Sequence, residues 1–207
     1  MDERTRIRRL PEKATTDRAA LHALLDAAKV AHVAFMDGGP VNIPVAAARD
    51  GDQLLLHGST GSRLFRTMTA GTEVCATVTL LDGLVLARSA FESSMHYRSA
   101  VIHGVPTVVT DKLSALRVMS EAWMPGRWET LRLPTSKELA ATLVVALPLT
   151  EWSVKISDGH PDDPPDDLDA PVWAGVLPVV TSYGDPVPAP DLRGDPPVPA
   201  YLSEWRP

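Results

Sequence analysis

A polar turn followed by two arginines carries residue types that bind anions. The turn, residues 58–63, follows the apolar run 54–56 and precedes a short predicted helix. Backbone N–H groups at a helix N-terminus attract negative charge. Arg63 and Arg66 can add charge-assisted hydrogen bonds to phosphate oxygens, and the turn carries three hydroxyl side chains, Ser59, Thr60 and Ser62. The pattern predicts a phosphate site; the alternative is a tight turn in which Thr60 or Ser62 only caps the helix.

A second polar segment leads directly into an apolar strand. Residues 93–99 read Ser-Ser-Met-His-Tyr-Arg-Ser, and the apolar residues 100–102 follow. An unpaired charge in a buried strand is unfavourable, so Arg98 needs a partner. Either a bound phosphate or an acidic side chain at a strand edge would satisfy it.

The hydrophobic pattern predicts many short strands and few helices. Helices are expected from Asp17 to about residue 30, at 63–70, at 110–123 and after Thr135, and strands at 30–36, 41–49, 53–57, 73–81, 97–109 and 142–147. Asp82-Gly83 has the composition of a turn, and residues 91–96 look like a loop. This spacing predicts a mainly β fold with a few helices, in a small antiparallel barrel of six or seven strands.

Composition divides the 207 residues near position 157. The net charge is −6, and six aspartates account for all of it: Asp158, Asp162, Asp163, Asp166, Asp167 and Asp169. The rest of the chain has equal numbers of acidic and basic residues, which argues against a nucleic-acid or membrane partner. We therefore predict a barrel domain at 1–157 and an acidic, proline-rich linker or loop at 158–171. An extension at 172–207 is expected to dock on the barrel or on a second subunit.

The sequence also favours a cytoplasmic protein. No apolar run reaches the ~18 residues of a transmembrane helix. The first nine residues are charged and lack the apolar segment of a secretion signal. A single cysteine, Cys75, allows no internal disulfide.

Taken together, the two polar segments resemble the pyridoxamine 5′-phosphate oxidase-like flavoproteins, in particular the branch of nitroimidazole-resistance proteins. The resemblance rests on His57-Gly58-Ser59 with Ser62-Arg63, on residues 94–101, and on residues 41–45 and 79–83. It covers roughly residues 5–180 of the chain. The family implies an FMN-binding split β-barrel that forms a homodimer, with flavin sites at the subunit interface.

The resemblance also implies flavin-binding positions. Four residues would hold the FMN phosphate, with Arg98 near it: Ser59, Thr60, Ser62 and Arg63. Four would line the isoalloxazine ring: Asn42, Ile43, Pro44 and Val45. The remaining positions lie along the ribityl chain (His57, Gly58) or near the ring or phosphate (Ser94, Met95, Tyr97, Ser99). No histidines have a metal-ligand spacing on one helix face, so no metal site is predicted.

An FMN-dependent oxidoreductase acting on a small molecule is the first functional hypothesis, because flavin chemistry needs no protein nucleophile. His96 and Tyr97 are the candidate catalytic proton donors, and His96 is the candidate axial ligand if the barrel holds haem. Trp173 is a candidate lid over the flavin. The alternatives are a non-catalytic flavin carrier and a haem- or deazaflavin-binding barrel. The C-terminal Arg/Trp-rich signature of the true oxidases is not recognisable, so pyridoxamine phosphate oxidation is not expected.

Overall fold

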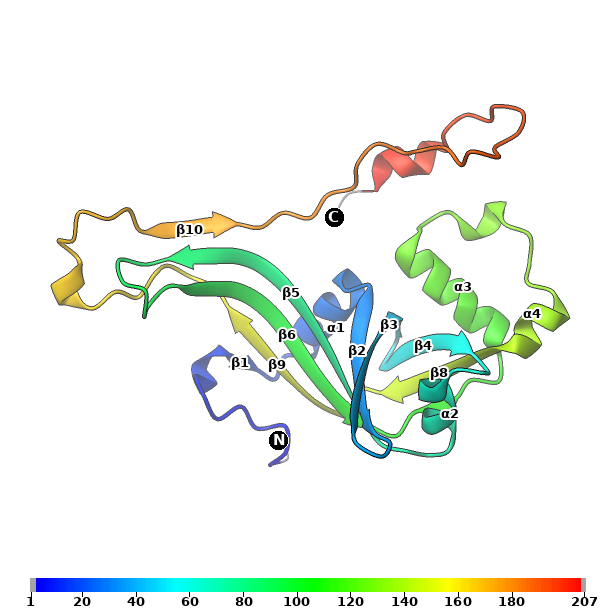
Figure 1. Cartoon of the computed structure of the whole chain (residues 1–207), viewed down its shortest axis with the longest axis horizontal. Helices are drawn as coiled ribbons and strands as arrows, with labels where there is room; N and C mark the ends of the chain where they lie inside the picture. The colour runs from blue at the N-terminus through cyan, green and yellow to red at the C-terminus, as the bar shows by residue number, and fades with distance from the viewer. Residues whose placement is uncertain (1–2, 206–207) are drawn as a thin grey trace.

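A computed structural model describes residues 3–205 and shows one antiparallel sheet with helices packed around it (Figure 1). The strands are β1 (Ala14–Thr15), β2 (Val30–Met36), β3 (Pro40–Asp50), β4 (Gln53–Ser59), β5 (Val74–Leu86), β6 (Ser94–Gly104), β7 (Thr107–Val108), β8 (Thr142–Pro148), β9 (Glu151–Ser157) and β10 (Gly175–Pro178). The helices are α1 (Arg18–Ala27), α2 (Arg63–Thr69), α3 (Lys112–Trp123) and α4 (Ser136–Ala141). Four short 3₁₀ segments complete the described elements: η1 (Pro11–Lys13), η2 (Trp128–Thr130), η3 (Pro165–Asp167) and η4 (Ala200–Glu204).

The mainly β split-barrel class is confirmed, but the strand count was too low. The sheet of residues 3–205 has ten strands, not six or seven. Two of them, β1 and β7, have only two residues each. Such a strand is too short to show an alternation of apolar and polar residues in the sequence. The helices of this range include none that is long and apolar enough to cross a membrane.

The sheet order explains how β5 organises the molecule. The strands follow β1-β9-β6-β5-β2-β3-β4-β8-β7, and β10 adds to β5. Strand β5 pairs with β6 along nearly its whole length, with β2 at residues 75–77, and with β10 at residues 83–86. Its outer half therefore belongs to a three-stranded arm of β10, β5 and β6 that projects from the barrel (Figure 1).

Asp82-Gly83 forms a bulge rather than the predicted turn. Leu81 pairs with Tyr97 and Gly83 pairs with His96, so β5 has one extra residue, Asp82, at this point. Such a bulge bends a strand without ending it. Pairing with strands on both sides overrides the local turn propensity of the dipeptide. The predicted loop at 91–96 was wrong in its second half, because β6 begins at Ser94.

Two apolar clusters make up the core. The larger packs the apolar stripe of α1 against the inward side chains of the strands; Leu21, Leu24 and Leu25 are each at most 1% exposed. The smaller lies beneath α3 and contains Leu55 of β4, Val144 of β8 and Met119 of α3. Since adjacent strand residues point to opposite faces, β4 contributes Leu54 and Leu56 to one cluster and Leu55 to the other.

Gly58 is required by packing between β4 and α2. A Cβ atom at this position would lie 2.6 Å from Cδ2 of Phe65, which is buried. Gly58→Ala should therefore lower the free energy of unfolding by about 1–3 kcal/mol through overpacking, measured by urea denaturation. Gly61→Ala is the control, because its Cβ would be 3.6 Å from the nearest atom. Equal destabilisation by both variants would contradict this explanation.

The segments after residue 157 contact the rest of the fold. In the acidic segment, the Asp163 carboxylate accepts hydrogen bonds from the backbone N–H of Arg88 (2.7 Å) and from its Nη1 (2.9 Å). The Asp163 side chain is only 1% exposed. Beyond β10 the chain runs back towards α3 (Figure 1), where Trp205 Nε1 donates to the carbonyl of Pro125 (3.1 Å).

Candidate functional site

The backbone of the 58–63 turn is already hydrogen-bonded within the chain. Thr60 N donates to Ala141 O (3.0 Å), Ser62 N to Ser59 O (2.9 Å), and Gly61 N to Ser59 Oγ (3.1 Å). The Ser62 side chain, at the N-cap of α2, makes no capping hydrogen bond. These three N–H groups of the turn already have partners within the chain, and an anion site at the N-terminus of α2 stays a prediction. The hydroxyl side chains of the turn, and Arg63 and Arg66 of the following helix α2, can still donate hydrogen bonds to an anion.

Those arginines line an open groove of about 410 Å³ between α2 and the β2–β3 turn. Its lining residues are Met36, Asp37, Arg63, Arg66, Thr67, Ala70 and Thr72. Arg63 is held on one wall by Asp37, with Nε donating to the carboxylate and Nη2 to the backbone oxygen (2.7 Å). The Arg66 guanidinium makes no hydrogen bond or ion pair with residues 3–205. The groove thus offers one positioned and one unpaired positive charge.

The four β3 residues predicted to line a flavin ring do not share one face. Asn42 and Pro44 are exposed, whereas Val45 is buried and Ile43 packs against the larger core cluster. Because successive side chains of a strand point to opposite faces of the sheet, Asn42 and Pro44 lie on one face and Ile43 and Val45 on the other. Only Asn42 and Pro44 can present side chains to a ligand on the outer face, and Ile43 and Val45 can offer only backbone there.

Arg98 is paired with an acid of its own chain. Its Nε and Nη2 each donate to a carboxylate oxygen of Asp82 at 2.8 Å. The bulge described above places Asp82 beside Arg98, and the guanidinium holds the pKa of Asp82 below its ordinary value of 3.8. An ion pair, one of the two alternatives drawn from the sequence, is the arrangement in this chain, although β5 and β6 are inner strands of the sheet.

The Arg98–Asp82 pair predicts a pH-dependent contribution to stability. A carboxyl whose pKa is lower when folded stabilises above its unfolded pKa, and this contribution is lost as the pH falls through the lowered value. Both side chains are more than a third exposed, so Arg98→Met should cost at most about 1 kcal/mol at pH 7. Chemical denaturation should show the difference from wild type shrinking below pH 3.8. A difference that stays constant down to pH 2 would contradict the pairing.

The two predicted halves of the flavin site lie on separated strands. Ser94, Met95, Tyr97 and Ser99 belong to β6, whereas the 58–63 turn begins in the last two residues of β4. Strands β5, β2 and β3 lie between them in the sheet order. The residues of β6 and those of the 58–63 turn are therefore not on neighbouring strands of one chain. The individual flavin-binding residues stay predictions. His96 lies close enough to Asp82 to help lower the pKa of that carboxyl.

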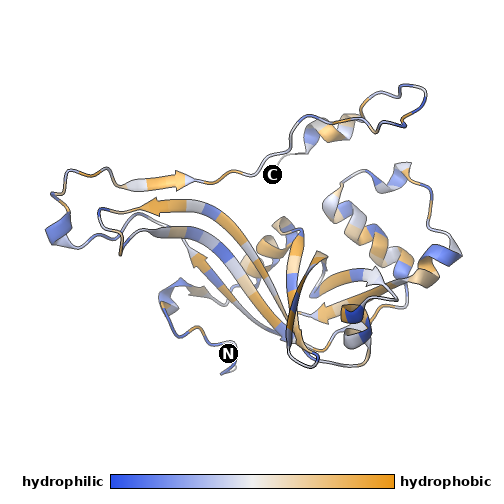
Figure 2. Ribbon diagram, in the orientation of Figure 1, coloured by the Kyte–Doolittle hydropathy of each residue, from blue (hydrophilic) through white to orange (hydrophobic). Residues whose placement is uncertain are grey.

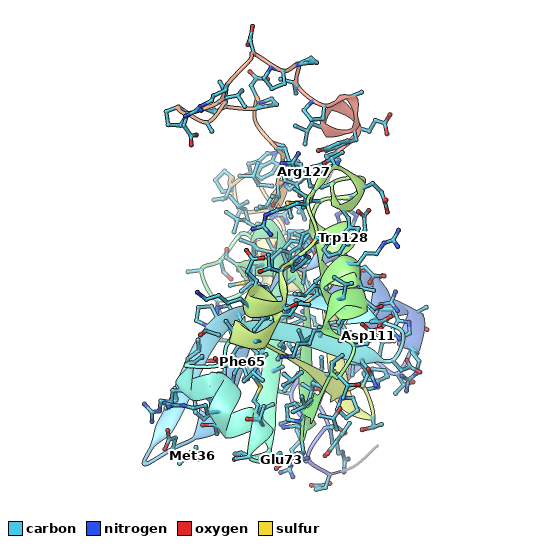
Figure 3. All side chains as sticks on the ribbon, turned by 90° about the vertical axis from the view of Figure 1, so that its right-hand side faces the viewer. Met36, Phe65, Glu73, Asp111, Arg127 and Trp128 are labelled. Carbon is cyan, nitrogen blue, oxygen red and sulfur yellow. The ribbon has the colours of Figure 1, made fainter. Side chains whose placement is uncertain are left out.

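A second hollow, which the sequence did not indicate, lies at the other end of the molecule. It has a volume of about 380 Å³ and is lined by four aromatic side chains, Trp123, Tyr183, Tyr201 and Trp205, with Lys29 and Glu204 among the rest. The rings of Tyr201 and Trp205 are stacked at 5.9 Å. Figure 3 places Arg127, whose Nη1 donates to the Tyr201 hydroxyl (3.1 Å), at the opposite end of the view from Met36 of the arginine groove. The two hollows are therefore distinct.

The aromatic cavity was missed because three of its four rings lie in the proline-rich extension. The sequence predicted only that this extension docks on the barrel or on a second subunit, and not which of its side chains would come together. The one available signal was the recurrence of Tyr183, Tyr201 and Trp205 in a segment otherwise rich in proline. Trp173, the predicted lid, is 69% exposed and packs on Gly175 of its own segment. Within residues 3–205 no three His, Cys, Asp or Glu side chains form a metal cluster.

An apolar row crosses the outer arm and faces solvent. Leu177 of β10 pairs with Leu84 of β5, which pairs with Met95 of β6. Directly opposed residues share a sheet face, and these three are 56%, 43% and 49% exposed. Figure 2 shows the hydrophobic character of β10 and of the neighbouring half of β5. No other part of residues 3–205 covers this apolar row.

The chain belongs to the pyridoxamine 5′-phosphate oxidase family, whose model matches residues 17–156. This match confirms the family predicted from the two polar segments. A comparison with curated proteins gave no match.

Two solved structures resemble nearly the whole chain. The FAD and haem binding protein from Mycobacterium smegmatis is 44% identical with a TM-score of 0.90, covering 94% of this chain and 97% of that one. The flavocytochrome Anf3 from Azotobacter vinelandii is 37% identical with a TM-score of 0.93, covering 99% and 97%. A candidate 5-nitroimidazole antibiotic resistance protein from Bacteroides thetaiotaomicron is 20% identical with a TM-score of 0.58, covering 69% and 86%; this likeness concerns the fold alone.

Proposed function

We propose that this chain is a flavin- and haem-binding oxidoreductase. The observation that carries the proposal is the length of the similarity. The family model ends at residue 156, but the similarity to a FAD and haem binding protein covers 94% of the chain and therefore includes most of the extension. The extension supplies three of the four rings of the aromatic cavity. A planar, largely apolar group such as haem fits walls of this chemistry.

The flavin is proposed to place its phosphates in the arginine groove. Arg63 and Arg66 supply the charge, and the hydroxyl groups of Thr60 and Ser62 lie in the adjoining turn. FAD is our first choice of flavin because the M. smegmatis protein is described as binding it. FMN, which the sequence motifs predicted, is the alternative.

We further propose a homodimer formed through the apolar row of the arm. A second copy would cover Leu84, Met95 and Leu177, which the described chain leaves exposed. The flavin site is further proposed to combine a β6 segment of one protomer with the β4 turn of the other, which the sheet order of one chain keeps apart. The flavin would then lie at the interface, as the family resemblance implied.

When bound, the flavin supplies two-electron and one-electron chemistry and the haem supplies one-electron chemistry. The contribution of the chain is to hold, orient and shield these groups. The arginine groove would neutralise phosphate charge, and the exposed side chains of Asn42 and Pro44 on β3 are proposed to contact the flavin. The substrate is proposed to be a small molecule.

The test is to titrate cofactors into protein stripped of them. Hemin should give a saturable shift of its absorption band, and either FAD or FMN should give saturable quenching of flavin fluorescence. Saturation by flavin together with no specific hemin binding would overturn the haem part and favour the flavin-only oxidoreductase. Absence of both would overturn the proposal. Whichever flavin binds more tightly identifies the cofactor.

A further inference from the structure

Lys29 is the only cation among the described residues that line the aromatic cavity. The same lining contains one acid, Glu204, and four aromatic rings. No histidine of residues 3–205 lines it, and His96, the candidate axial ligand from the sequence, belongs to β6. The chemistry of these walls is therefore that of aromatic side chains with one positive and one negative charge.

Lys29 lies between the aromatic cavity and a smaller hollow of about 190 Å³. The two hollows share Lys29 and Ala122. In the smaller one Asp26 and Arg49 satisfy each other through two hydrogen bonds of 2.8 Å. Along both hollows, as residues 3–205 form them, Lys29 is therefore the cation without an acidic partner.

The Lys29 ammonium is held in place but not neutralised. Its Nζ donates to the carbonyl of Ala122 at 2.5 Å, in the last turn of α3, where the helix dipole favours a cation. None of the ion pairs formed by residues 3–205 includes Lys29. An ammonium has three donors, and the side chain is exposed, so two donors and the full charge remain for a ligand.

A cation of this kind beside aromatic walls suits a ligand that combines a flat apolar ring with a carboxylate. The four aromatic side chains of the lining can pack against such a ring. A carboxylate pairs with an ammonium through short, charge-assisted hydrogen bonds. Glu204 would repel a carboxylate, so a bound carboxylate is favoured beside Lys29 rather than beside Glu204. Haem has this combination, because its apolar ring carries two propionate carboxylates.

We propose that Lys29 binds the propionate carboxylates of the haem in the aromatic cavity and so fixes the orientation of the ring. This role rests on the haem binding proposed above and names the residue that selects for a carboxylate. It involves the charge of the porphyrin and requires no contact with the iron. Selectivity for a carboxylated ring distinguishes it from a structural lysine that only ties the α1–β2 connection to α3.

The test uses iron-free protoporphyrin IX and its dimethyl ester, which has the same ring but no ionised carboxylate. Wild type should bind the acid about 5–20-fold more tightly, because a charged hydrogen bond shielded by a bound ring is stronger than an exposed ion pair. Lys29→Met should abolish this preference by weakening binding of the acid alone, whereas Lys29→Arg should keep it. Titrations of porphyrin fluorescence measure each dissociation constant.

Lys112→Met is the matched control. Lys112 Nζ donates to the carbonyl of Leu139 in α4 at 2.9 Å, and Lys112 does not line the cavity. The control therefore removes the same kind of lysine–carbonyl hydrogen bond and should leave the affinities for acid and ester unchanged. Equal weakening of acid and ester by Lys29→Met would show that Lys29 only supports the packing of α3, and would overturn the proposed role.

Failure of this role and failure of the proposed function give different results. Wild type that binds none of hemin, acid and ester would overturn the haem part of the proposed function, and the role of Lys29 with it. Wild type that binds hemin but takes up acid and ester equally would overturn the role of Lys29 alone, and this comparison decides even if Lys29→Met fails to fold. If only iron porphyrins bind, hemin and its dimethyl ester replace the iron-free pair, with the same expected preference.

Discussion

Replacing Arg63 with alanine is expected to weaken flavin binding by about 10–100-fold. Charge-assisted hydrogen bonds contribute about 1.5–3 kcal/mol, and Arg63 is the arginine of the groove that Asp37 holds in position. The change should appear as a larger dissociation constant in fluorescence titrations. The loss of affinity caused by Arg63→Ala should be smaller for riboflavin, which carries no phosphate.

Two further variants show whether the effect comes from phosphate binding. Asp37→Asn weakens the competing ion pair, so its flavin affinity should equal or exceed that of wild type. Arg117→Ala removes an exposed arginine paired with Glu129 on the α3 side and should change nothing. If Asp37→Asn lost as much affinity as Arg63→Ala, the pair would be a structural support of the β2–β3 turn and the phosphate role would be wrong.

Leu84→Glu is expected to convert a dimer into a monomer. Leu84 is the central residue of the apolar row, between Leu177 and Met95, and burying an unpaired charge there is unfavourable by several kcal/mol. Light scattering coupled to size-exclusion chromatography should show half the mass of wild type. Flavin affinity should fall with it, because the proposed site needs residues of both protomers.

Val187→Glu is the control for this variant. Val187 is 90% exposed in the extension, so the same substitution there should leave mass and flavin affinity unchanged. A wild-type mass for Leu84→Glu would show that the arm is not the interface. A monomeric variant with wild-type flavin affinity would place the flavin within one chain.

Most of the fold could be predicted because its signals are local. The predicted helices that begin at Asp17 and after Thr135 are both present, as α1 and α4. The arm could not be predicted, because its evidence is not local. Asp82-Gly83 has turn composition, and only its pairing with β6 and β10 turns it into a bulge. Strand β10 likewise depends on β5, more than eighty residues earlier in the chain.

The candidate site was predicted in part for the same reason. Residue types marked Arg63 as a cation near a turn, but Asp37, which holds it, comes from a different turn. Arg98 was seen to need a partner, and its partner was the acid of the unexpected bulge. The family resemblance placed His57 along the ribityl chain of the flavin, but its buried, unpaired Nδ1 and its contact with Trp123 exist only after α3 packs on β4.

The most direct test of the account is the cofactor content of the purified full-length chain. Cofactors released by denaturation would be identified and counted by mass spectrometry, with a reduced-minus-oxidised absorption spectrum of the intact protein. We predict one flavin and one haem for each chain. Purified protein that holds flavin at full occupancy but neither contains haem nor takes up added hemin would contradict the central claim.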